Sequence, residues 1–400
     1  MNRQWILRIA GIAAVIFLFI FPFVYKRADY NFIMHLWITA FFYAILASSW
    51  SLLAGYAGQF SFGHMAFMAI GAHSAALYGN YIRITTAPTK LCTEFQIGSR
   101  WLVLLDPQGV TSSSENCLAL ARATLPRGTV IAQPSIWWGI LLGIVMGAVF
   151  GMLIGYLVLR LRRTYLALFT IGFSEILRAV ISAEIDITQG QAGLELVPLF
   201  PKGLNIFGMS YSSTDKIPPY YAMLIVFLVC MGIMSWLVSS RFGLFLRSIR
   251  EDEEAAAAMG VNIVRYKVMA FVITAAMAAA AGAIQGHYIG IITPNILVIL
   301  QMSLVIAMAV IGGLENIVSA AIGAIVIQFV LEFLRNSFDI GPVTVDMSIW
   351  RLVVFGAILM LTLRFQRNGL LQPILQWFSR ASVAEETVAK RQAVATEGGN

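Results

Sequence analysis

The stretch from Ser51 to Leu77 reads SLLAGYAGQFSFGHMAFMAIGAHSAAL. Its first half holds three glycines and three polar side chains, Gly55, Gly58, Gly63, Gln59, Ser61 and His64. Such residues are unfavourable in a hydrocarbon layer unless they allow close packing, end a helix or line a polar cavity. Because apolar runs flank them on both sides, the pattern predicts a break between two membrane helices.

The composition excludes a soluble protein. The chain has 400 residues, of which 59% are hydrophobic and 12% charged, and its mean hydropathy is +0.80. A soluble domain of this size could not hide so much apolar surface. The formal net charge of +7 does not indicate nucleic-acid binding, because the basic residues cluster at the ends of apolar runs, as in membrane proteins.

Apolar runs close to the ~20 residues that cross a bilayer predict an all-α, polytopic helical membrane protein with about ten transmembrane helices. The run from Trp5 to Tyr25 is interpreted as a retained span, because it is long and lacks a small-residue cleavage site. The predicted spans are 5–25, 31–53, 60–82, 135–159, 164–183, 220–240, 266–289, 297–313, 316–334 and 349–364.

Basic clusters predict the orientation. They follow the fourth, sixth and last spans, at Arg160, Arg162, Arg163, Arg241, Arg247, Arg250, Arg364 and Arg367. Since an excess of Arg and Lys marks cytoplasmic segments, ten crossings place all of these clusters and both termini in the cytoplasm. Lys26 and Arg27 fall on the other side and count against this scheme. The predicted organisation is an N-terminal span in 1–30, a transmembrane domain in 31–364 and a cytoplasmic tail in 365–400.

The same orientation places an insertion at 83–134 and a loop at 184–219 outside the cell. Cys92 and Cys117 both lie in the insertion and would face an oxidising compartment, which predicts a disulfide between them. The alternative is two free thiols in a loop, and alkylation before and after reduction, read by mass spectrometry, distinguishes the two. The cysteines and the four scattered histidines show no metal-site spacing, so no metal is expected.

A faint internal repeat is also visible. Ala69-Ile70-Gly71-Ala72 in the third span matches Ala321-Ile322-Gly323-Ala324 in the ninth, and each follows a glycine-rich turn. Both spans would run from inside to outside, so the repeat would be parallel. Small-residue patterns also recur by chance in membrane helices.

The sequence contains no recognisable catalytic machinery. It has no Gly-Lys dipeptide and therefore no phosphate-binding loop, and it has neither a His-Glu metal motif nor a nucleophile elbow. No catalytic residue and no bound cofactor are predicted. The chain is not expected to be an enzyme or to hydrolyse ATP itself.

The segment RSIREDEEAAAAMGVNIVRYK, from Arg247 to Lys267, predicts a short cytoplasmic helix. Its acidic residues, Glu251, Asp252, Glu253 and Glu254, precede an alanine run, where acids favour a helix N-terminus. Gly260 and Asn262 are expected to end the helix. One interpretation is a solvated connecting helix; the other is a helix that docks into a groove on a partner.

Glu254-Ala255-Ala256 followed by Gly260 resembles the Glu-Ala-Ala…Gly loop of the permeases of ATP-binding-cassette (ABC) importers. In that family the loop forms a coupling helix that docks into a cleft on an ATPase subunit. The resemblance implies that 247–265 is a coupling loop. It also implies that Glu253, Glu254, Ala255, Ala256 and Gly260 carry ATPase coupling.

Three further stretches narrow the resemblance to branched-chain amino acid permeases. They are GYAGQFSFGHMAFMAIGAHSAAL, ALFTIGFSEILRAV at Ala167–Val180, and TQGQAGLELVP at Thr188–Pro198. The similarity extends from about Ala40 to Arg364, with the insertion as an interruption. Departures fall in the external loop, where Gln189 and Leu196 replace family glycines and Val197 replaces isoleucine, and at His73, where tyrosine is common.

This resemblance implies a permease in the bacterial inner membrane that moves branched-chain or other neutral amino acids. Its implied partners are two ATPase subunits that bind Mg-ATP, a second related permease, an external solute-binding protein and the lipid bilayer. Uptake of urea or short amides by the same machinery is the alternative within the class. An ion-coupled secondary transporter is the rival from another class, and it would use Glu175 as an ion relay.

Several single residues keep two interpretations each. Gln59, Ser61 and His64 either line the solute pathway or hold helices together. Glu175 and Arg178 are three apart on one helix and should face the protein interior, either as an ion pair that stabilises the structure or as substrate or gating groups. Gln189 is a further pathway candidate, because the resemblance implies that its loop touches the solute.

Overall fold

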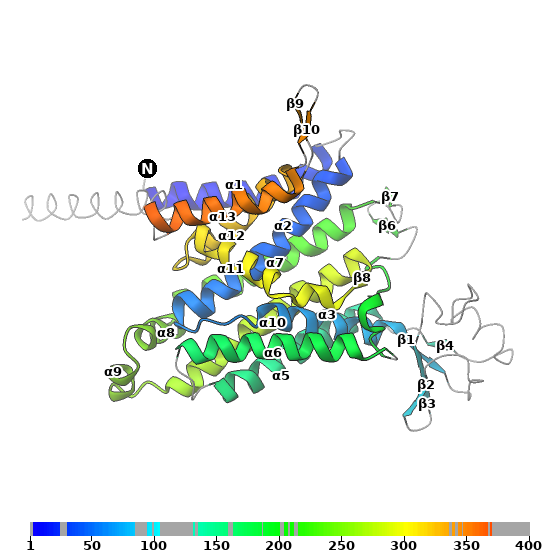
Figure 1. Cartoon of the computed structure of the whole chain (residues 1–400), viewed down its shortest axis with the longest axis horizontal. Coiled ribbons are helices and arrows are strands. Elements are labelled where there is room, and N and C mark those ends of the chain that lie inside the picture. Colours follow the sequence, from blue (N-terminus) through cyan, green and yellow to red (C-terminus); the bar gives the residue numbers. More distant parts are fainter. Residues whose placement is uncertain are drawn as a thin grey trace, which may run out of the picture.

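The computed structural model describes residues 3–24, 30–84, 94–97, 100–104, 131–132, 135–158, 163–185, 187–200, 204–206, 209–211, 215–335, 338–340, 343–345, 347–366 and 369. Helices dominate this part of the chain and confirm the all-α, polytopic membrane fold (Figure 1). The helices are α1 Arg3–Val24, α2 Tyr30–Ser51, α3 His64–Asn80, α5 Ile136–Val158, α6 Arg163–Ala183, α7 Ile217–Ser239, α8 Arg241–Glu251, α9 Glu253–Ala258, α10 Ile263–Ile289, α11 Ile299–Gly312, α12 Ile317–Phe333 and α13 Met347–Phe365.

A helix occupies each of the ten predicted spans, but the helices differ in length. Five of those described are long and apolar enough to cross a membrane alone: α2 with its continuation to Tyr56, α5, α6, α7 and α10. α11 and α12 form a pair bent by 118°. α3 has only 17 residues and begins at His64 rather than at residue 60, because the chain before it is unwound.

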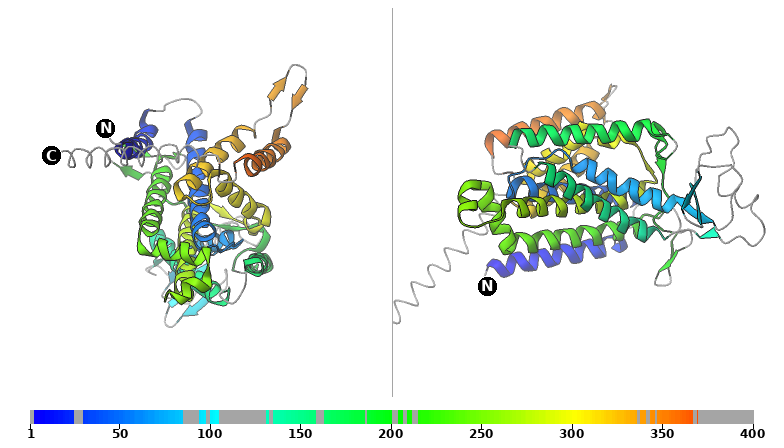
Figure 2. Two further views of the ribbon diagram at one scale, coloured as in Figure 1. Left: turned by 90° about the vertical axis from the view of Figure 1, so that its left-hand side faces the viewer. Right: turned by 90° about the horizontal axis from the view of Figure 1, so that it is seen from below.

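The helix bundle has two distinct ends. α8 and α9 protrude at one end, and short strands cap the other (Figures 1 and 2). We call these the α9 end and the strand end. The loop predicted to be cytoplasmic and the described parts of the two segments predicted to be external therefore lie at opposite ends of the bundle.

The strands at the strand end are short. They are β1 Tyr81–Ile84, β2 Glu94–Ile97, β3 Arg100–Leu104, β4 Ile131–Ala132, β5 Leu194–Glu195, β6 Leu204–Ile206, β7 Met209–Tyr211, β8 Ile291–Ile292, β9 Phe338–Ile340 and β10 Val343–Val345. β1 to β4 form an antiparallel sheet in the order β2-β3-β1-β4. β5 pairs with β8, Leu194 opposite Ile292, which joins the loop after α6 to the end of α10.

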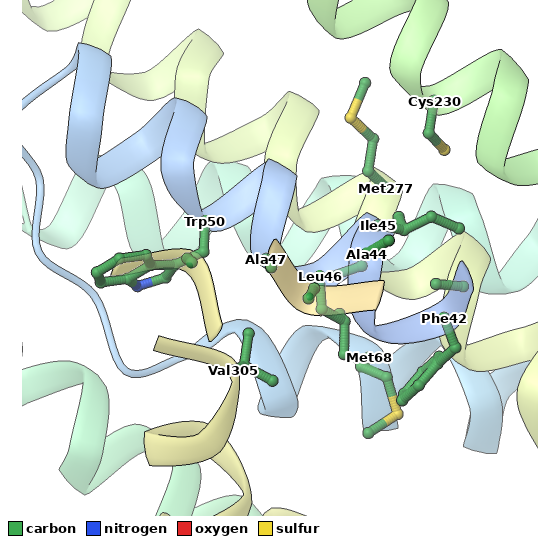
Figure 3. Close-up of a cluster of buried hydrophobic side chains, with 14 of the residues drawn as sticks. Phe42, Ala44, Ile45, Leu46, Ala47, Trp50, Met68, Cys230, Met277 and Val305 are labelled. Atoms are coloured by element: carbon green, nitrogen blue, oxygen red, sulfur yellow. The ribbon is translucent and has the colours of Figure 1, made fainter. Parts of the chain in front are cut away.

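The core surrounds α2, whose last two turns are buried on every side. Trp50 of α2, Phe41 of α2 and Tyr220 of α7 are among the largest fully buried side chains. Figure 3 shows part of this core, where α2 supplies Phe42, Ile45 and Leu46 to one hydrophobic cluster. In contrast, α5 and α7 expose large apolar side chains such as Trp138 and Trp236, as helices that face lipid do.

α5 carries a seam of glycines that the sequence analysis did not single out. One glycine stands at every fourth position, at Gly139, Gly143, Gly147, Gly151 and Gly155. The seam faces α3 and α10: a Cβ on Gly143 would lie 2.4 Å from the carbonyl oxygen of Gly71, and one on Gly147 would lie 2.3 Å from Ala279 Cβ. Glycine therefore lets these three helices approach to backbone contact, as small residues do in membranes.

Candidate functional site

α9, the predicted coupling helix, begins at a well-formed cap. The backbone N–H groups of Glu254 and Ala255 donate to Asp252 Oδ1 at 2.9 and 3.0 Å, which satisfies two of the free donors of the first turn. Gly260 follows the helix with a φ of +82°, a conformation that glycine adopts without steric penalty. Asn262 does not end α9 as expected. Its Oδ1 instead accepts from Arg265 N–H at 3.0 Å and starts α10.

The surface of α9 is almost entirely exposed. Of its six residues only Ala256 is buried, with 5% of its surface exposed, while Glu254, Ala255, Ala257 and Ala258 are exposed. The next residue, Met259, is 85% exposed. We call Glu254, Ala255, Ala257, Ala258 and Met259 the α9 tip. Sequence reasoning missed Met259, although a large apolar side chain in a polar loop is itself a signal for a docking surface.

Lys267 joins α9 to the membrane helices. Lys267 of α10 donates to Glu253 Oε1, and the Lys267 side chain is only 10% exposed. Glu253, predicted to couple to an ATPase, is thus held by this chain, and Ala256 also faces the bundle. Among the predicted coupling residues, only Ala256 is buried; Glu253 is exposed but paired with Lys267, and Glu254, Ala255 and Gly260 are exposed.

Arg250, at the end of α8, connects three segments. Its Nη1 donates to the carbonyl oxygen of Gly55 at 2.6 Å and to Glu315 Oε1 at 3.1 Å, and its Nη2 donates to Glu251 Oε1 at 2.7 Å. Partial burial disfavours the guanidinium charge, but the hydrogen bonds and charges of Glu251 and Glu315 outweigh this and raise the pKa of Arg250. We call this arrangement the Arg250 clamp.

The glycines of the opening motif make room for the clamp. A Cβ on Gly55 would lie 2.0 Å from the carbonyl oxygen of Leu314, in the turn between α11 and α12. Gly58 has a φ of +67° and lies against the Arg250 side chain, where a Cβ would be 3.0 Å from Cγ. Ser51 adds a hydrogen bond from its hydroxyl to Leu314 O at 2.7 Å. The end of α2, the end of α8 and the α11–α12 turn are therefore one packed unit.

Arg250→Ala is expected to destabilise this unit by about 1–3 kcal/mol, because a part-buried carbonyl and a carboxylate lose their charged donor. Arg250→Lys should recover only part of the loss, since an ammonium cannot span the three acceptors as a guanidinium does. Arg247→Ala is the matched control: Arg247 lies over the Tyr56 ring at 4.9 Å and should matter less. Thermal unfolding in detergent measures the melting temperatures of the three variants. Equal melting temperatures for Arg250→Ala and Arg247→Ala would contradict the prediction.

The segment 57–63, between the two helices, is mostly buried but not helical; Phe60 is its exposed residue. Gln59 N–H donates to Leu53 O at 3.1 Å, and Trp50 Nε1–H donates to Ser61 O at 2.7 Å. Phe62 N–H donates to Thr170 Oγ1 of α6 at 2.9 Å. The segment therefore runs back along α2, visible as the thin blue link in Figure 1, and is not an exposed turn. Unwound backbone is tolerated within a membrane domain where protein satisfies it in this way.

The three polar side chains of the opening motif point into the protein. Gln59, Ser61 and His64 are all buried. Ser61 Oγ accepts from Gly63 N–H at 3.1 Å and so supports the local turn, whereas Gln59 Oε1 has no hydrogen-bond partner among the described residues. None of the three lines the cavity near Arg250 or the cavity near Gln285. A contact between these side chains and solute stays a prediction.

Glu175 and Arg178 form an ion pair on α6, with Arg178 Nε 2.8 Å from Glu175 Oε2. Their side chains are 40% and 34% exposed, so the expectation that both face the protein interior is wrong. The physical reason is that a pair three residues apart on one helix satisfies itself and needs no neighbouring helix. Glu332 and Arg335 repeat this arrangement at 3.0 Å.

The loop after α6 closes the strand end. Gln189, a pathway candidate, has a φ of +59°, in the left-handed region that glycine adopts without steric penalty. Leu196 is buried in a small cluster with Ala72 of α3, and the Val197 carbonyl oxygen lies 2.7 Å from His287 Nδ1 of α10. This loop therefore packs against the second half of α3 and the end of α10.

The predicted disulfide concerns residues that the structure does not describe. Cys92 and Cys117 lie outside the described residues, as do nearly all residues of the tail, so the disulfide stays a prediction. Within the described ranges, no group of three or more His, Cys, Asp or Glu side chains could hold a metal ion.

Comparison with known proteins places these features in a family. The family model for the permease component of branched-chain amino acid transport systems matches residues 32–363. The chain is 30% identical to the high-affinity branched-chain amino acid transport system permease protein LivM of Escherichia coli strain K12, over 48% of this chain and 51% of LivM. It is 32% identical to LivH of Salmonella typhimurium, over 44% of this chain and 56% of LivH.

A more distant similarity links the chain to the xylose transport system permease protein XylH of Escherichia coli, at 32% identity over 35% of each chain. The chain spans only about half the length of the branched-chain relatives it matches. No solved structure matches it. The match across residues 32–363 nevertheless shows that this chain belongs to the family of permease components of branched-chain amino acid transport systems.

Proposed function

We propose that this chain is the transmembrane permease subunit of an ABC importer that carries branched-chain or other neutral amino acids across the bacterial inner membrane. One observation carries the proposal: an exposed six-residue helix, followed by the exposed apolar side chain of Met259, is joined to α10 by Lys267, while Arg250 holds the preceding α8 against the end of α2 and the α11–α12 turn. A solvated connecting loop would require neither a large exposed apolar side chain such as Met259 nor the ion pair between Glu253 and Lys267.

These contacts connect the α9 tip mechanically to the membrane helices. A displacement of α9 would be transmitted to α10 through the ion pair between Glu253 and Lys267. It would also be transmitted through the adjoining α8 and the Arg250 clamp to the end of α2 and the α11–α12 turn. Closure of an ATPase dimer against the tip would then be transmitted to two sites in the bundle at once. The chain supplies a gated passage, whereas ATP hydrolysis takes place on the partner subunits.

The proposed assembly contains two ATPase subunits that bind Mg-ATP, at the α9 end, and a second related permease beside this chain. A solute-binding protein delivers cargo at the strand end. Both termini of the chain lie in the cytoplasm. An ion-coupled secondary transporter is less well supported, because Glu175, its best relay candidate, is already paired with Arg178 and half-exposed on α6.

Co-purification tests the proposal directly. The chain should be expressed with candidate ATPase, permease and binding-protein partners, purified through a tag on this chain alone, and reconstituted into proteoliposomes. We expect ATPase subunits to co-purify, and leucine uptake to require both ATP inside and the binding protein outside. Uptake that needs a proton or sodium gradient and no ATP would overturn the proposal and support the secondary transporter.

A further inference from the structure

A cavity of about 210 Å³ opens between α2, α3, α10 and α11, toward the strand end. This volume far exceeds the ~30 Å³ that one water molecule takes in the liquid. Segments far apart in the sequence form its walls, from His35 and Phe42 on α2 to Gln301 on α11. Figure 3 shows two of the wall residues, Phe42 and Met68, at the edge of the core.

The lining is mostly apolar and carries no carboxylate, lysine or arginine among the described residues. Its apolar part comes from aromatic, thioether and isoleucine side chains, Phe42, Met65, Met68, Ile289, Ile292 and Ile296. The polar part is neutral and small, with His35, Thr39, Gln285 and Gln301 as its main members. A few polar groups in an apolar concavity are the usual composition of a small-molecule site.

Two of these polar groups have partners within the protein, but the Gln285 amide oxygen does not. His35 Nδ1 lies 2.7 Å from Tyr288 Oη, and the Thr39 hydroxyl donates to His35 O at 2.9 Å. Gln285 Oε1 is buried without a hydrogen-bond partner, and only 7% of the Gln285 surface is exposed. A buried amide oxygen without a donor is unfavourable by about 1–3 kcal/mol unless a ligand supplies the donor.

We propose that this cavity is the site that holds the solute as it crosses the membrane, with Gln285 Oε1 as acceptor for the solute's N–H group. The lining fits a small molecule with an aliphatic body and no net charge, such as an aliphatic amino acid, whose ammonium group would donate to Gln285 Oε1 and whose carboxylate would depend on the remaining neutral donors of the lining. A pentose fits poorly, because each of its hydroxyl groups needs a polar partner, although one relative of this chain is a xylose permease. The assignment rests on the proposed function and deepens it.

The wall that α3 contributes connects the cavity to the α9 end of the bundle. Met65 and Met68 lie in the first two turns of α3, directly after the unwound segment 57–63. That segment follows Gly55, which the Arg250 clamp holds. A displacement of the clamp would therefore move the start of α3 and reshape the cavity, which gives the coupling helix a path to the bound solute.

The test uses the complete importer in proteoliposomes with radiolabelled L-leucine, below saturation. Gln285→Met keeps the side-chain length and removes the acceptor, and it should lower leucine uptake about tenfold, the loss that corresponds to one hydrogen bond of 1.4 kcal/mol. Thr39→Trp fills the cavity from α2 and should abolish uptake. Co-purification of the subunits should be unchanged in both variants. Gln328→Met makes the same change at a buried glutamine of α12 that does not line the cavity, and should transport normally.

The outcomes separate the two proposals. If the wild-type importer moves no leucine, the proposed function fails. If it moves leucine and both Gln285→Met and Thr39→Trp do so at the wild-type rate, the function stands and the cavity is not the solute site. If either variant does not assemble, Gln301→Met, at a half-exposed lining position, carries the same test. Faster xylose than leucine uptake would overturn the solute class.

Discussion

Replacement of Gly71 with leucine is expected to abolish the folded protein. Gly71 lies where α3 meets both α5 and α10: a Cβ there would be 2.4 Å from Ala279 O and 2.5 Å from Ala279 Cα. These are backbone atoms of a packed helix, so they cannot rotate away as a side chain can. Even Gly71→Ala should cost about 1–3 kcal/mol from overpacking, whereas leucine would drive α3 and α10 apart. Size-exclusion profiles and thermal unfolding in detergent measure both effects.

Gly232→Ala on α7 is the matched control for this prediction. A Cβ at Gly232 meets nothing within 4 Å, so alanine should be neutral or stabilise the helix by up to about 1 kcal/mol. The two Gly-to-Ala substitutions are therefore predicted to have opposite signs. If Gly71→Ala had the melting temperature of the wild-type protein, α3, α5 and α10 would not pack as closely as the structure indicates.

Replacement of Glu254 with arginine is expected to uncouple ATP hydrolysis from transport. Glu254 lies on the α9 tip, where its side chain is exposed and makes no contact that the fold needs. The charge reversal should leave insertion and thermal stability unchanged, but it should reduce binding-protein-dependent leucine uptake about tenfold or more, as for a central residue of a docking interface. Gly260→Val should act similarly, because valine disfavours the φ of +82° that ends the helix.

The control for the tip is Arg364→Glu, a charge reversal at an exposed position on α13, which ends on the α9 side of the bundle but away from α9. It should leave uptake and ATP hydrolysis coupled. Proteoliposomes report both rates in the same preparation. Normal uptake by Glu254→Arg and Gly260→Val together would remove α9 as the coupling element.

The amino-acid sequence by itself determined the helices and their order. Each apolar run became a helix at nearly the predicted bounds, for example 135–159 against Ile136–Val158, because backbone groups in hydrocarbon must find partners within their own segment. The cap and end of α9 also followed from local residues, since Asp252 and Gly260 act on the backbone beside them. Local rules failed at Asn262, where cap residues suit the end of one helix and the start of the next equally well.

Only the tertiary structure decided how those helices meet and what they enclose. Arg250 binds the carbonyl of Gly55, 195 residues away in the sequence, and Gln285 faces a cavity whose other walls are α2, α3 and α11. The α5 glycines could have faced lipid or another subunit as readily as α3 and α10. Helical periodicity specifies which residues share a face but not what that face touches, because the partner of each face depends on packing between distant segments.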